Sequence, residues 1–301
     1  MTRMRAAVVS AWSPLHVNDA EIPAINEDEV LIAVCTSSVG AVDRELCAGA
    51  SSASLPIVPG MDVAGVVAGV GSRVTRFRVG DEVWCVAGDL RHRTMGAWSE
   101  FVSAAECRVG FRPTNLTFDE AGALPLVGLT ALQAVRRGML MPGNVALVLG
   151  GSGGVGVCAV QIARAFGASK VYATCSSKNI DLLRSLGAVP INYQTHDCWD
   201  DLDLDLDFVL DTVGEPGTLD KASKCLRPDG HFVSIVTSSD LGDDHRPPFN
   251  THFICATCDD SNDLDELKAL CEANELSVPI QAIFDLDDLP KALTLSPPLP
   301  R

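Results

Sequence analysis

The sequence predicts an α/β protein in which a β-rich N-terminal part precedes a doubly wound parallel sheet. Short valine-rich segments separated by glycines occupy residues 1 to about 115, and such segments are typical of strands joined by turns. From Asn144 onward, apolar strands alternate with helical patterns, which is the order that builds a parallel sheet covered on both faces. A length of 301 residues accommodates two such domains.

The individual elements follow in chain order. In the N-terminal part we predict strands within residues 28–40, 61–71 and 80–88. In the second part, apolar residues recur at helical spacing from Val155 to Phe166, and Gly167 ends the pattern. The other predicted strands are 144–150, 170–175, 189–193, 206–213, 231–236 and 278–284, and the other predicted helices are 176–188, 218–227 and 262–274.

The composition excludes several classes of function. A formal net charge of −16 would repel the phosphates of nucleic acids and of anionic membranes, so we expect neither as a partner. No apolar run reaches the about 18 residues that a membrane span needs. Trp12, Pro14 and His16 interrupt the start too early for a signal peptide, and we therefore expect a cytoplasmic protein.

The cysteines and the acidic repeat are interpreted in structural rather than functional terms. Eleven scattered cysteines, an odd number, fit reduced thiols better than a disulfide framework. Cys255 and Cys258 have no second pair at zinc spacing, so we expect no metal site there. The repeat DLDLDLD at residues 201–207 is predicted to be a solvated strand entry rather than a cation site, since charge runs usually face water.

The stretch LVLGGSGGVG, residues 147–156, carries the clearest functional pattern. Its glycines form G-x-G-x-x-G directly after an apolar strand and at the start of a helix, which is the context of a dinucleotide-binding turn. There the first glycine permits a tight turn, the second lets a pyrophosphate approach the backbone, and the third lets helix and strand pack closely. A purely structural glycine turn is the alternative. The predicted cofactor-binding residues here are Gly151, Ser152, Gly153, Gly154, Val155 and Gly156.

The end of the next strand predicts which dinucleotide binds. An NAD site carries an acidic residue about 20 residues past the motif. Here Cys175 is followed by Ser176, Ser177 and Lys178, and the first carboxylate is Asp181. A hydroxyl and a cation suit a 2′-phosphate, so we predict NADPH as the cofactor. The alternative is that a serine only caps the helix and that Lys178 lies in solvent.

The chain resembles the medium-chain dehydrogenases/reductases, and within them the zinc-independent quinone oxidoreductases of the zeta-crystallin type and the enoyl reductases. Long segments match, from the N-terminal part through the glycine turn and beyond it. They are PIVPGMDVAGVVAGVGSRVTRFRVGDEVW at 56–84, GAWSEFV at 96–102, AGALPLVGLTALQAV at 121–135, SSKNIDLLRSLGAVPINY at 176–193 and DTVG at 211–214.

The resemblance implies a domain plan. We expect a GroES-like catalytic domain at 1–115, a Rossmann NADP-binding domain at 116–258, and a return to the first domain at 259–301, with the nicotinamide in the cleft between domains. The return lacks the glycine-lysine turn and valine-rich strand of relatives, so we expect it to be truncated or divergent. Many relatives are dimers, and we expect a homodimer through the sheet edge at 231–236 and 251–257.

The resemblance also implies further site residues. On the adenosine side of the cofactor we expect Ser176, Lys178 and Tyr193, and nearer the nicotinamide Thr130, Val213 and Ile235.

Zinc ligands are not expected. Zinc alcohol dehydrogenases carry a cysteine where this chain has Gly40, and a His-Glu pair where it has Met61 and Asp62, and neither glycine nor methionine binds zinc in such sites. Many quinone oxidoreductases have an asparagine at the position of Gly40, beside the substrate, whereas Asp43 matches. Relatives often carry an aromatic residue near the position of Ser51. The substrate side is therefore less typical than the cofactor side.

These observations predict a zinc-independent, NADPH-dependent reductase that transfers hydride to a quinone or to the activated double bond of an α,β-unsaturated carbonyl compound. The cofactor carries the hydride chemistry, and the negative charge that develops on the carbonyl oxygen needs a donor in a water-poor site. Thr130 and Asp43 are the candidate catalytic residues, although Asp43 is equally compatible with anchoring a turn. A carrier-linked enoyl reductase and a catalytically inactive NADPH-binding regulatory or structural protein remain alternatives.

Overall fold

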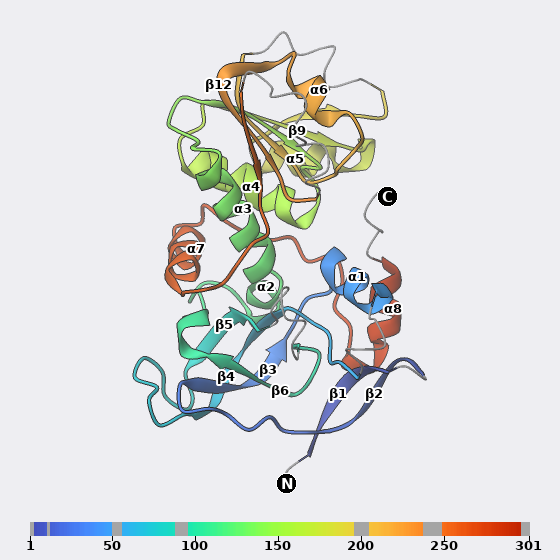
Figure 1. Cartoon of the computed structure of the whole chain (residues 1–301), viewed down its shortest axis with the longest axis vertical. Helices are drawn as coiled ribbons and strands as arrows, with labels where there is room; N and C mark the ends of the chain where they lie inside the picture. Colours follow the sequence, from blue (N-terminus) through green and yellow to red (C-terminus); the bar gives the residue numbers. More distant parts are fainter. Residues whose placement is uncertain are drawn as a thin grey trace. The chain divides into compact units, whose positions relative to one another are not determined.

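The chain forms two compact units that each combine distant segments (Figure 1). A computed structural model describes residues 3–10, 13–49, 56–87, 96–195, 205–236 and 249–295. Unit 1 contains residues 1–126, 258–272 and 278–299, and unit 2 contains residues 127–257, 273–277 and 300–301.

Unit 1 is built on an antiparallel sheet of five strands in the order β6-β3-β4-β5-β7. β1 (Arg3–Ser10) and β2 (Ser13–Glu21) form a separate two-stranded sheet. The five strands are β3 (Glu29–Thr36), β4 (Asp62–Val70), β5 (Glu82–Val86), β6 (Phe101–Ala105) and β7 (Val109–Phe111).

The core of unit 1 follows from the alternation of side chains along these strands. Val30 and Ile32 of β3 and Val63 and Val67 of β4 are buried in one apolar cluster, together with Val83 of β5. Residues two apart on a strand share a face, so these positions all meet on the covered side of the sheet. The helices of this unit are α1 (Ala41–Gly49), α2 (Phe118–Gly122), α7 (Asn262–Glu272) and α8 (Leu289–Leu295).

The segments that return to unit 1 are held by charged side chains. Arg76 donates from Nη2 to both carboxylate oxygens of Asp265 on α7, at 2.6 Å each. At the end of α7, Glu272 accepts hydrogen bonds from the N–H and hydroxyl of Thr114, at 3.0 and 2.8 Å. The strand predicted at 278–284 is wrong: this segment is irregular, and Ile283 is 67% exposed, because no described strand pairs with it.

Unit 2 contains a parallel sheet of six strands in the order β10-β9-β8-β11-β12-β13. The first strand in the chain, β8, lies inside the sheet, and the order reverses between β8 and β11, as in a doubly wound nucleotide-binding fold. The predicted α/β fold class is confirmed. The strands are β8 (Val145–Leu149), β9 (Lys170–Cys175), β10 (Val189–Asn192), β11 (Leu206–Asp211), β12 (Leu226–Ser234) and β13 (Asn250–Phe253).

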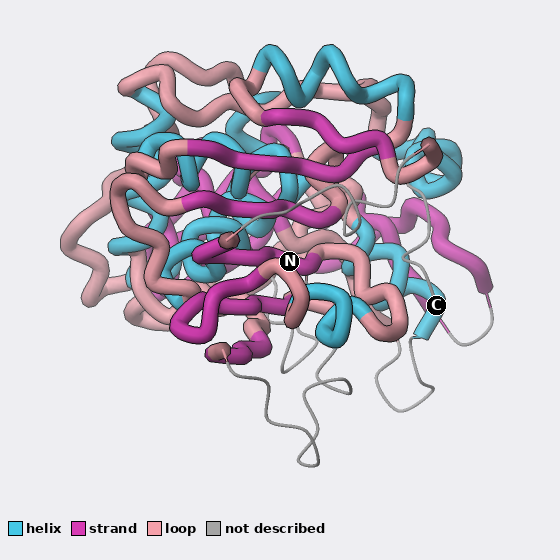
Figure 2. The backbone as a smooth tube through the Cα atoms, turned by 90° about the horizontal axis from the view of Figure 1, so that it is seen from above, coloured by secondary structure: helices cyan, strands magenta, loops and turns pink. Residues whose placement is uncertain are grey.

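Helices lie alongside these parallel strands (Figure 2). α4 (Gly154–Ala165) packs on β8 and β9, α5 (Ile180–Ser185) packs on β9 and β10, and α6 (Thr218–Ala222) packs on β12. The helix predicted at 218–227 is shorter than expected, because the chain must turn after Ala222 to enter β12. Unit 2 also holds most of α3 (Pro125–Arg137). None of the helices in the described ranges is long and apolar enough to cross a membrane.

Two glutamines of unit 2 bind the backbone where the chain leaves this unit. Gln133 of α3 donates to Thr257 O at 2.7 Å and accepts from Thr257 N at 3.1 Å. Gln161 of α4 does the same at Ser277, with distances of 2.8 Å to its O and 3.1 Å from its N. Each side-chain amide pairs with both the N–H and the C=O of one backbone residue, as a residue of a neighbouring strand would. Thr257 and Ser277, where the chain leaves unit 2, are therefore both fixed to helices of this unit.

We predict that Gln161→Leu destabilises unit 2. The substitution removes the partners of Ser277 N and O, and each backbone group left unpaired costs about 1–3 kcal/mol. Urea unfolding should show a lower midpoint than wild type, whereas Gln281→Leu, at an exposed position, should leave the midpoint unchanged. Equal midpoints for Gln161→Leu and wild type would show that the exit point is held by other contacts.

Candidate functional site

The glycine turn between β8 and α4 is the centre of the candidate site in unit 2. Gly150 has φ +75°, a left-handed conformation that favours glycine. Its N–H donates to Thr174 Oγ1 at 2.8 Å, and the N–H of Gly151 donates to Thr174 O at 2.9 Å. The end of β9 therefore anchors the turn, and the tight conformation lies at Gly150, one residue earlier than the motif predicts.

The three motif glycines meet different constraints. A Cβ on Gly151 would lie 2.6 Å from Ala173 Cβ, and a Cβ on Gly156 would overlap Gly150 O and lie 2.7 Å from Gly151 Cα. Protein atoms therefore require glycine at both positions. A Cβ on Gly153 would meet only Gly150 O, at 3.4 Å. Packing within the protein does not require glycine at position 153. The close approach of a ligand would explain why glycine stands there.

The first turn of α4 presents unpaired N–H groups. Gly153 is the N-cap residue and no side chain caps the helix, and the first N–H groups of a helix have no partner within it. Gly153 and Gly154 are exposed, while Ser152 and Val155 are half-buried. The helix dipole adds positive potential at this end, so the turn has the donors and the field that bind a phosphate.

The predicted adenosine-side residues lie at the ends of two neighbouring strands. Ser176 and Lys178 follow β9, and Tyr193 follows β10 with its N–H donating to Cys175 O at 3.2 Å. Lys178 and Tyr193 are exposed. Within the described part of the chain, Lys178 has no carboxylate at salt-bridge distance and the Ser176 hydroxyl has no hydrogen-bond partner. Both polar groups are therefore available to a ligand.

The serines do not cap a helix. Ser176 is the N-cap of a 3-10 turn, η3 (Ser177–Asn179), and makes no capping hydrogen bond. Ser177 Oγ donates instead to Gln194 Oε1 at 2.7 Å and accepts from Asn192 Nδ2 at 3.2 Å. The capping half of the alternative interpretation is thus not what the structure shows, although Lys178 is exposed as that alternative requires.

The end of β11 lies beside the glycine turn. A Cβ on Gly150 would lie 2.9 Å from Val213 Cγ2. Asp211, only 2% exposed, holds this loop, because its Oδ1 accepts the N–H groups of Val213 and Gly214 at 2.9 Å each. The N–H of Ile235, after β12, donates to Asp211 O at 3.1 Å. Val213 and Ile235 therefore lie at the carboxyl ends of β11 and β12, and Val213 lies where the strand order reverses.

Thr130 lies on α3 and is 8% exposed. Val127, one helical turn earlier, would be 3.0 Å from a Cβ on Gly154. The start of α3 thus contacts the start of α4. Unit 2 therefore brings Val127, the glycine turn, Val213 and the end of β9 together, and Thr130 follows Val127 by one helical turn.

Asp43, the other predicted catalytic residue, lies in unit 1 and is 1% exposed. Its Oδ2 accepts the N–H of Gly40 at 2.8 Å. Burial raises the pKa of Asp43 to about 7; the Gly40 N–H lowers it and the neighbouring Asp62 raises it. Burial also raises the pKa of Asp62 to about 6, although Asp62 accepts from Ser38 Oγ and from Leu126 N at 2.6 Å each. Asp43 thus anchors a turn, and with a pKa of about 7 it is about half protonated at pH 7.

The turn around Asp43 carries unsatisfied polar groups. Among the described residues, four side-chain atoms are buried without a hydrogen-bond partner, and three of them lie within residues 37–44: Ser37 Oγ, Asp43 Oδ1 and Arg44 Nη1. Buried polar groups are nearly always paired in native proteins, so we expect these three atoms to bind a group outside the described residues.

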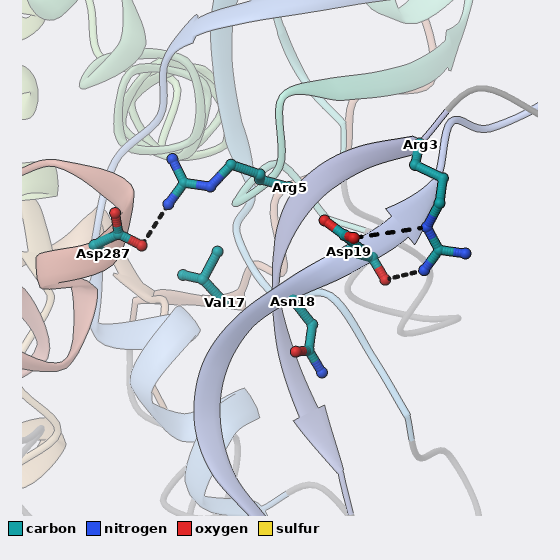
Figure 3. Close-up of a pocket in the computed structure, with 6 residues that line it drawn as sticks. All are labelled: Arg3, Arg5, Val17, Asn18, Asp19 and Asp287. Atoms are coloured by element: carbon teal, nitrogen blue, oxygen red, sulfur yellow. Dashed lines mark hydrogen bonds and ion pairs between the residues drawn. The ribbon is translucent and has the colours of Figure 1, made fainter.

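A third feature, a hollow of about 500 Å³ on the β1–β2 hairpin, does not coincide with any predicted site residue (Figure 3). Its two arginines are each paired with a carboxylate, Arg3 with Asp19 and Arg5 with Asp287. The hollow therefore offers no free cation to an anionic ligand. It is lined by Arg3, Arg5, Val17, Asn18, Asp19 and Asp287.

The cysteines and acidic residues form no metal centre in the part of the chain that is described: no group of three or more His, Cys, Asp or Glu residues is placed to hold an ion. Cys255 is exposed and belongs to unit 2, and Cys258 is buried in unit 1 with Sγ 3.5 Å from Arg108 O. Much of the acidic repeat at 201–207 lies outside the described residues. Asp207 is an exception to the predicted solvation, because its side chain is 14% exposed and pairs with Arg227.

Two family models match the chain. Residues 26–112 match the alcohol dehydrogenase GroES-like domain, and residues 154–255 match the zinc-binding dehydrogenase domain. A zinc-type alcohol dehydrogenase-like protein of Schizosaccharomyces pombe is 33% identical over 76% of this chain and 69% of its own length. The chain belongs to the medium-chain dehydrogenase/reductase superfamily. The resemblance and the GroES-like and Rossmann folds that it implies are confirmed.

The zinc-independent quinone oxidoreductase branch of the superfamily fits best. The structure of the quinone oxidoreductase from Coxiella burnetii superimposes with a TM-score of 0.87 at 28% identity, covering 98% of this chain and 94% of the other. The 2-methylene-furan-3-one reductase of Solanum lycopersicum is 40% identical over 73% of this chain. The NADPH-dependent alkenal/one oxidoreductase of Arabidopsis thaliana, a chloroplastic protein, is 37% identical over 77%. The chain spans 58% and 62% of these two relatives.

A nicotinamide cofactor fits the residues present. The open face at Gly153 and the unpaired first turn of α4 suit a pyrophosphate, and members of this superfamily use such a cofactor. Sequence reasoning missed Gly150, Thr174 and Asp211, which shape the turn from β8, β9 and β11. Only the glycine run could have indicated Gly150, because hydrogen bonds between strands leave no periodic signal.

We predict opposite outcomes for two matched glycine substitutions. Gly156→Ala places a methyl group against the backbone of Gly150 and Gly151 and should lower the thermal midpoint by several degrees. Gly153→Ala should leave the midpoint nearly unchanged but weaken dinucleotide binding by about tenfold or more, because its methyl group meets the ligand rather than the protein. Differential scanning fluorimetry and a fluorescence titration separate the two. Unweakened binding by Gly153→Ala would contradict a ligand at this turn.

We also predict that Asp43 makes the stability of unit 1 depend on pH. Its folded pKa of about 7 lies above the ordinary value, so the folded state binds more protons between about pH 4 and pH 7 and loses stability as the pH rises through that window. Asp43→Asn should gain stability relative to wild type by on the order of a few kcal/mol between pH 5 and 8. Urea unfolding across this range tests it, with the exposed Asp181→Asn as control. A difference in unfolding free energy between Asp43→Asn and wild type that stays constant across this pH range would refute the raised pKa of Asp43.

Proposed function

We propose that this chain is a zinc-independent, NADPH-dependent reductase of quinones or of the activated double bond of α,β-unsaturated carbonyl compounds. The observation that supports it most is the edge of unit 2, where an exposed glycine turn opens α4 and an unpaired lysine follows β9. Lys178 gains its meaning from its place, because the next residue, Asn179, contacts Ser152 of the glycine turn and no acidic residue stands at the end of β9.

The residues divide the cofactor between them. The turn from Gly151 to Gly156 would hold the pyrophosphate, with the N–H groups of the first turn of α4 as donors. Ser176, Lys178 and Tyr193 would hold the 2′-phosphate and adenosine ribose. Thr130, Val213 and Ile235 would line the nicotinamide end. When bound, the nicotinamide supplies a hydride. The absence of an acidic residue at the end of β9 favours the phosphorylated form of the cofactor.

The substrate side is proposed to involve the turn at 37–44 in unit 1. Reduction of a conjugated carbonyl places negative charge on its oxygen, and a donor in a water-poor site stabilises that charge. Asp43 carries an unpaired oxygen and a pKa near 7, so a fraction of it is a neutral acid able to donate. Zinc is not part of the proposal, because Gly40 and Met61 stand where zinc dehydrogenases have ligands.

The names of two relatives support this substrate class, because one is a 2-methylene-furan-3-one reductase and the other an alkenal/one oxidoreductase. The domain boundaries expected at residues 115 and 258 remain proposals. The second lies where the chain returns to unit 1, whereas the first segment of unit 1 extends to residue 126. The homodimer also remains a proposal, supported by β13, a terminal strand of the described sheet on which Phe253 is 45% exposed. The cytoplasmic location remains a prediction from the sequence, and relatives include chloroplastic and mitochondrial proteins.

Lys178→Ala tests the cofactor half of the proposal. Wild type should bind NADPH tightly and NADH weakly, and the variant should lose about tenfold or more of its NADPH affinity with little change for NADH, since a charge-assisted hydrogen bond contributes about 1.5–3 kcal/mol. A fluorescence titration with both nucleotides measures this, with the exposed Lys224→Ala as control. Equal losses for both nucleotides would place Lys178 away from the 2′-phosphate.

Turnover then tests the substrate half. NADPH oxidation with a panel of quinones and enones should proceed steadily in wild type. Tight NADPH binding without turnover on any acceptor would favour the inactive binding protein. Activity confined to enoyl groups on an acyl carrier would favour the carrier-linked reductase.

A further inference from the structure

Asn179 connects the two halves of the proposed cofactor site. It directly follows Lys178 at the end of the 3-10 turn η3, and its Nδ2 donates to Ser152 Oγ at 2.9 Å. Ser152 lies between Gly151 and Gly153 on the glycine turn. One amide therefore ties the segment proposed to hold the 2′-phosphate to the turn proposed to hold the pyrophosphate.

Asn179 occupies a position where asparagine ordinarily does something else. It is the N-cap residue of α5, with φ −109° and ψ 6°, and its side chain makes no capping hydrogen bond. An asparagine at this position usually accepts the N–H of the second or third helical residue and stabilises the helix by about 1 kcal/mol. Here no such capping bond is made, and the Nδ2 of the amide contacts Ser152. The observed role of the side chain is thus this contact and not the capping of α5.

The hydrogen bonds of Ser152 show what the contact leaves available. A serine hydroxyl can donate once and accept twice. Asn179 supplies a donor, so the hydroxyl accepts from it and its own O–H still requires an acceptor. Among the described residues no acceptor is within reach of Ser152. The first N–H groups of α4, which have no partner within the helix, are donors as well, so the Ser152 hydroxyl and this helix start together suit an acceptor such as a phosphate oxygen.

We propose that Asn179 is a positioning residue that orients the Ser152 hydroxyl to donate to the pyrophosphate of the dinucleotide. The inference rests on the proposed function, because it assumes that a dinucleotide binds at this turn. Asn179 acts through Ser152 and not on the ligand itself. Since NADPH and NADH share the pyrophosphate, Asn179 and Ser152 contribute equally to both, whereas Lys178 contributes to NADPH alone.

A double-mutant cycle tests this. Dissociation constants for NADPH and NADH are measured by nucleotide fluorescence for wild type, Ser152→Ala, Asn179→Ala and the double variant. Ser152→Ala should weaken both nucleotides by about tenfold and Asn179→Ala by about threefold to tenfold. The double variant should bind no more weakly than Ser152→Ala, because Asn179 has nothing left to position. Ser152→Thr, which keeps the hydroxyl, should restore binding.

Two further variants control the interpretation. Asn18→Ala removes an exposed amide in unit 1 and should leave both affinities unchanged. Asn179→Asp keeps the shape of the side chain, so it serves if the alanine variants fold poorly. Its carboxylate would take the Ser152 O–H for itself and repel phosphate, and it should weaken both nucleotides more than Asn179→Ala. Thermal midpoints measured in parallel show that each variant is folded.

The contrary outcomes are distinct. Independent losses that multiply in the double variant would show that Asn179 does not act through Ser152. A loss for NADPH alone would place Asn179 on the 2′-phosphate. If wild type binds neither nucleotide, the proposed function fails and the inference with it, whereas normal wild-type binding with an unaffected Asn179→Ala overturns only the inference.

Discussion

The close approach of α4 to the glycine turn is the constraint on which the candidate site depends. The backbone of Gly156 lies so near Gly150 O and Gly151 Cα that no side chain fits. Gly151 in turn lies against Ala173 of β9. This packing aims the first turn of α4 at the carboxyl edge of the sheet, where its unpaired N–H groups meet solvent. The positions of Ser152 and of the exposed Gly153 both follow from it, because they lie between these fixed points.

Burial explains which parts of the fold could be predicted from the sequence. β9 was predicted at 170–175 and is observed as Lys170–Cys175, because a parallel strand covered on both faces is a continuous apolar run. The segment 278–284 has a similar composition but no partner strand among the described residues, and its side chains from Pro279 to Phe284 are exposed. Composition records the propensity to form a strand, whereas strand formation requires an edge to pair with. That edge is a property of the whole unit.

The candidate site could be predicted only where its chemistry is local in sequence. The glycine motif and the stretch Ser176 to Lys178 are contiguous, and each raised a hypothesis. The contacts that organise them are not: Thr174 binds a glycine 24 residues away, and Asn179 binds Ser152 across 27 residues. Such pairs involve ordinary residue types at ordinary positions, so no periodicity or spacing distinguishes them. They become visible once β8 and β9 are neighbours.

Charge has different consequences at the two scales of this molecule. A net charge of −16 disfavours the binding of anions in general. Several arginines of unit 1 are paired with carboxylates, as Arg76 is with Asp265. Lys178 is exposed and has no such partner among the described residues. In water, the long-range repulsion is screened within about 10 Å at ordinary ionic strength. A phosphate at the end of β9 would therefore respond to the nearby lysine and the helix dipole, rather than to the total charge. Local arrangement thus permits an anionic cofactor on an acidic protein.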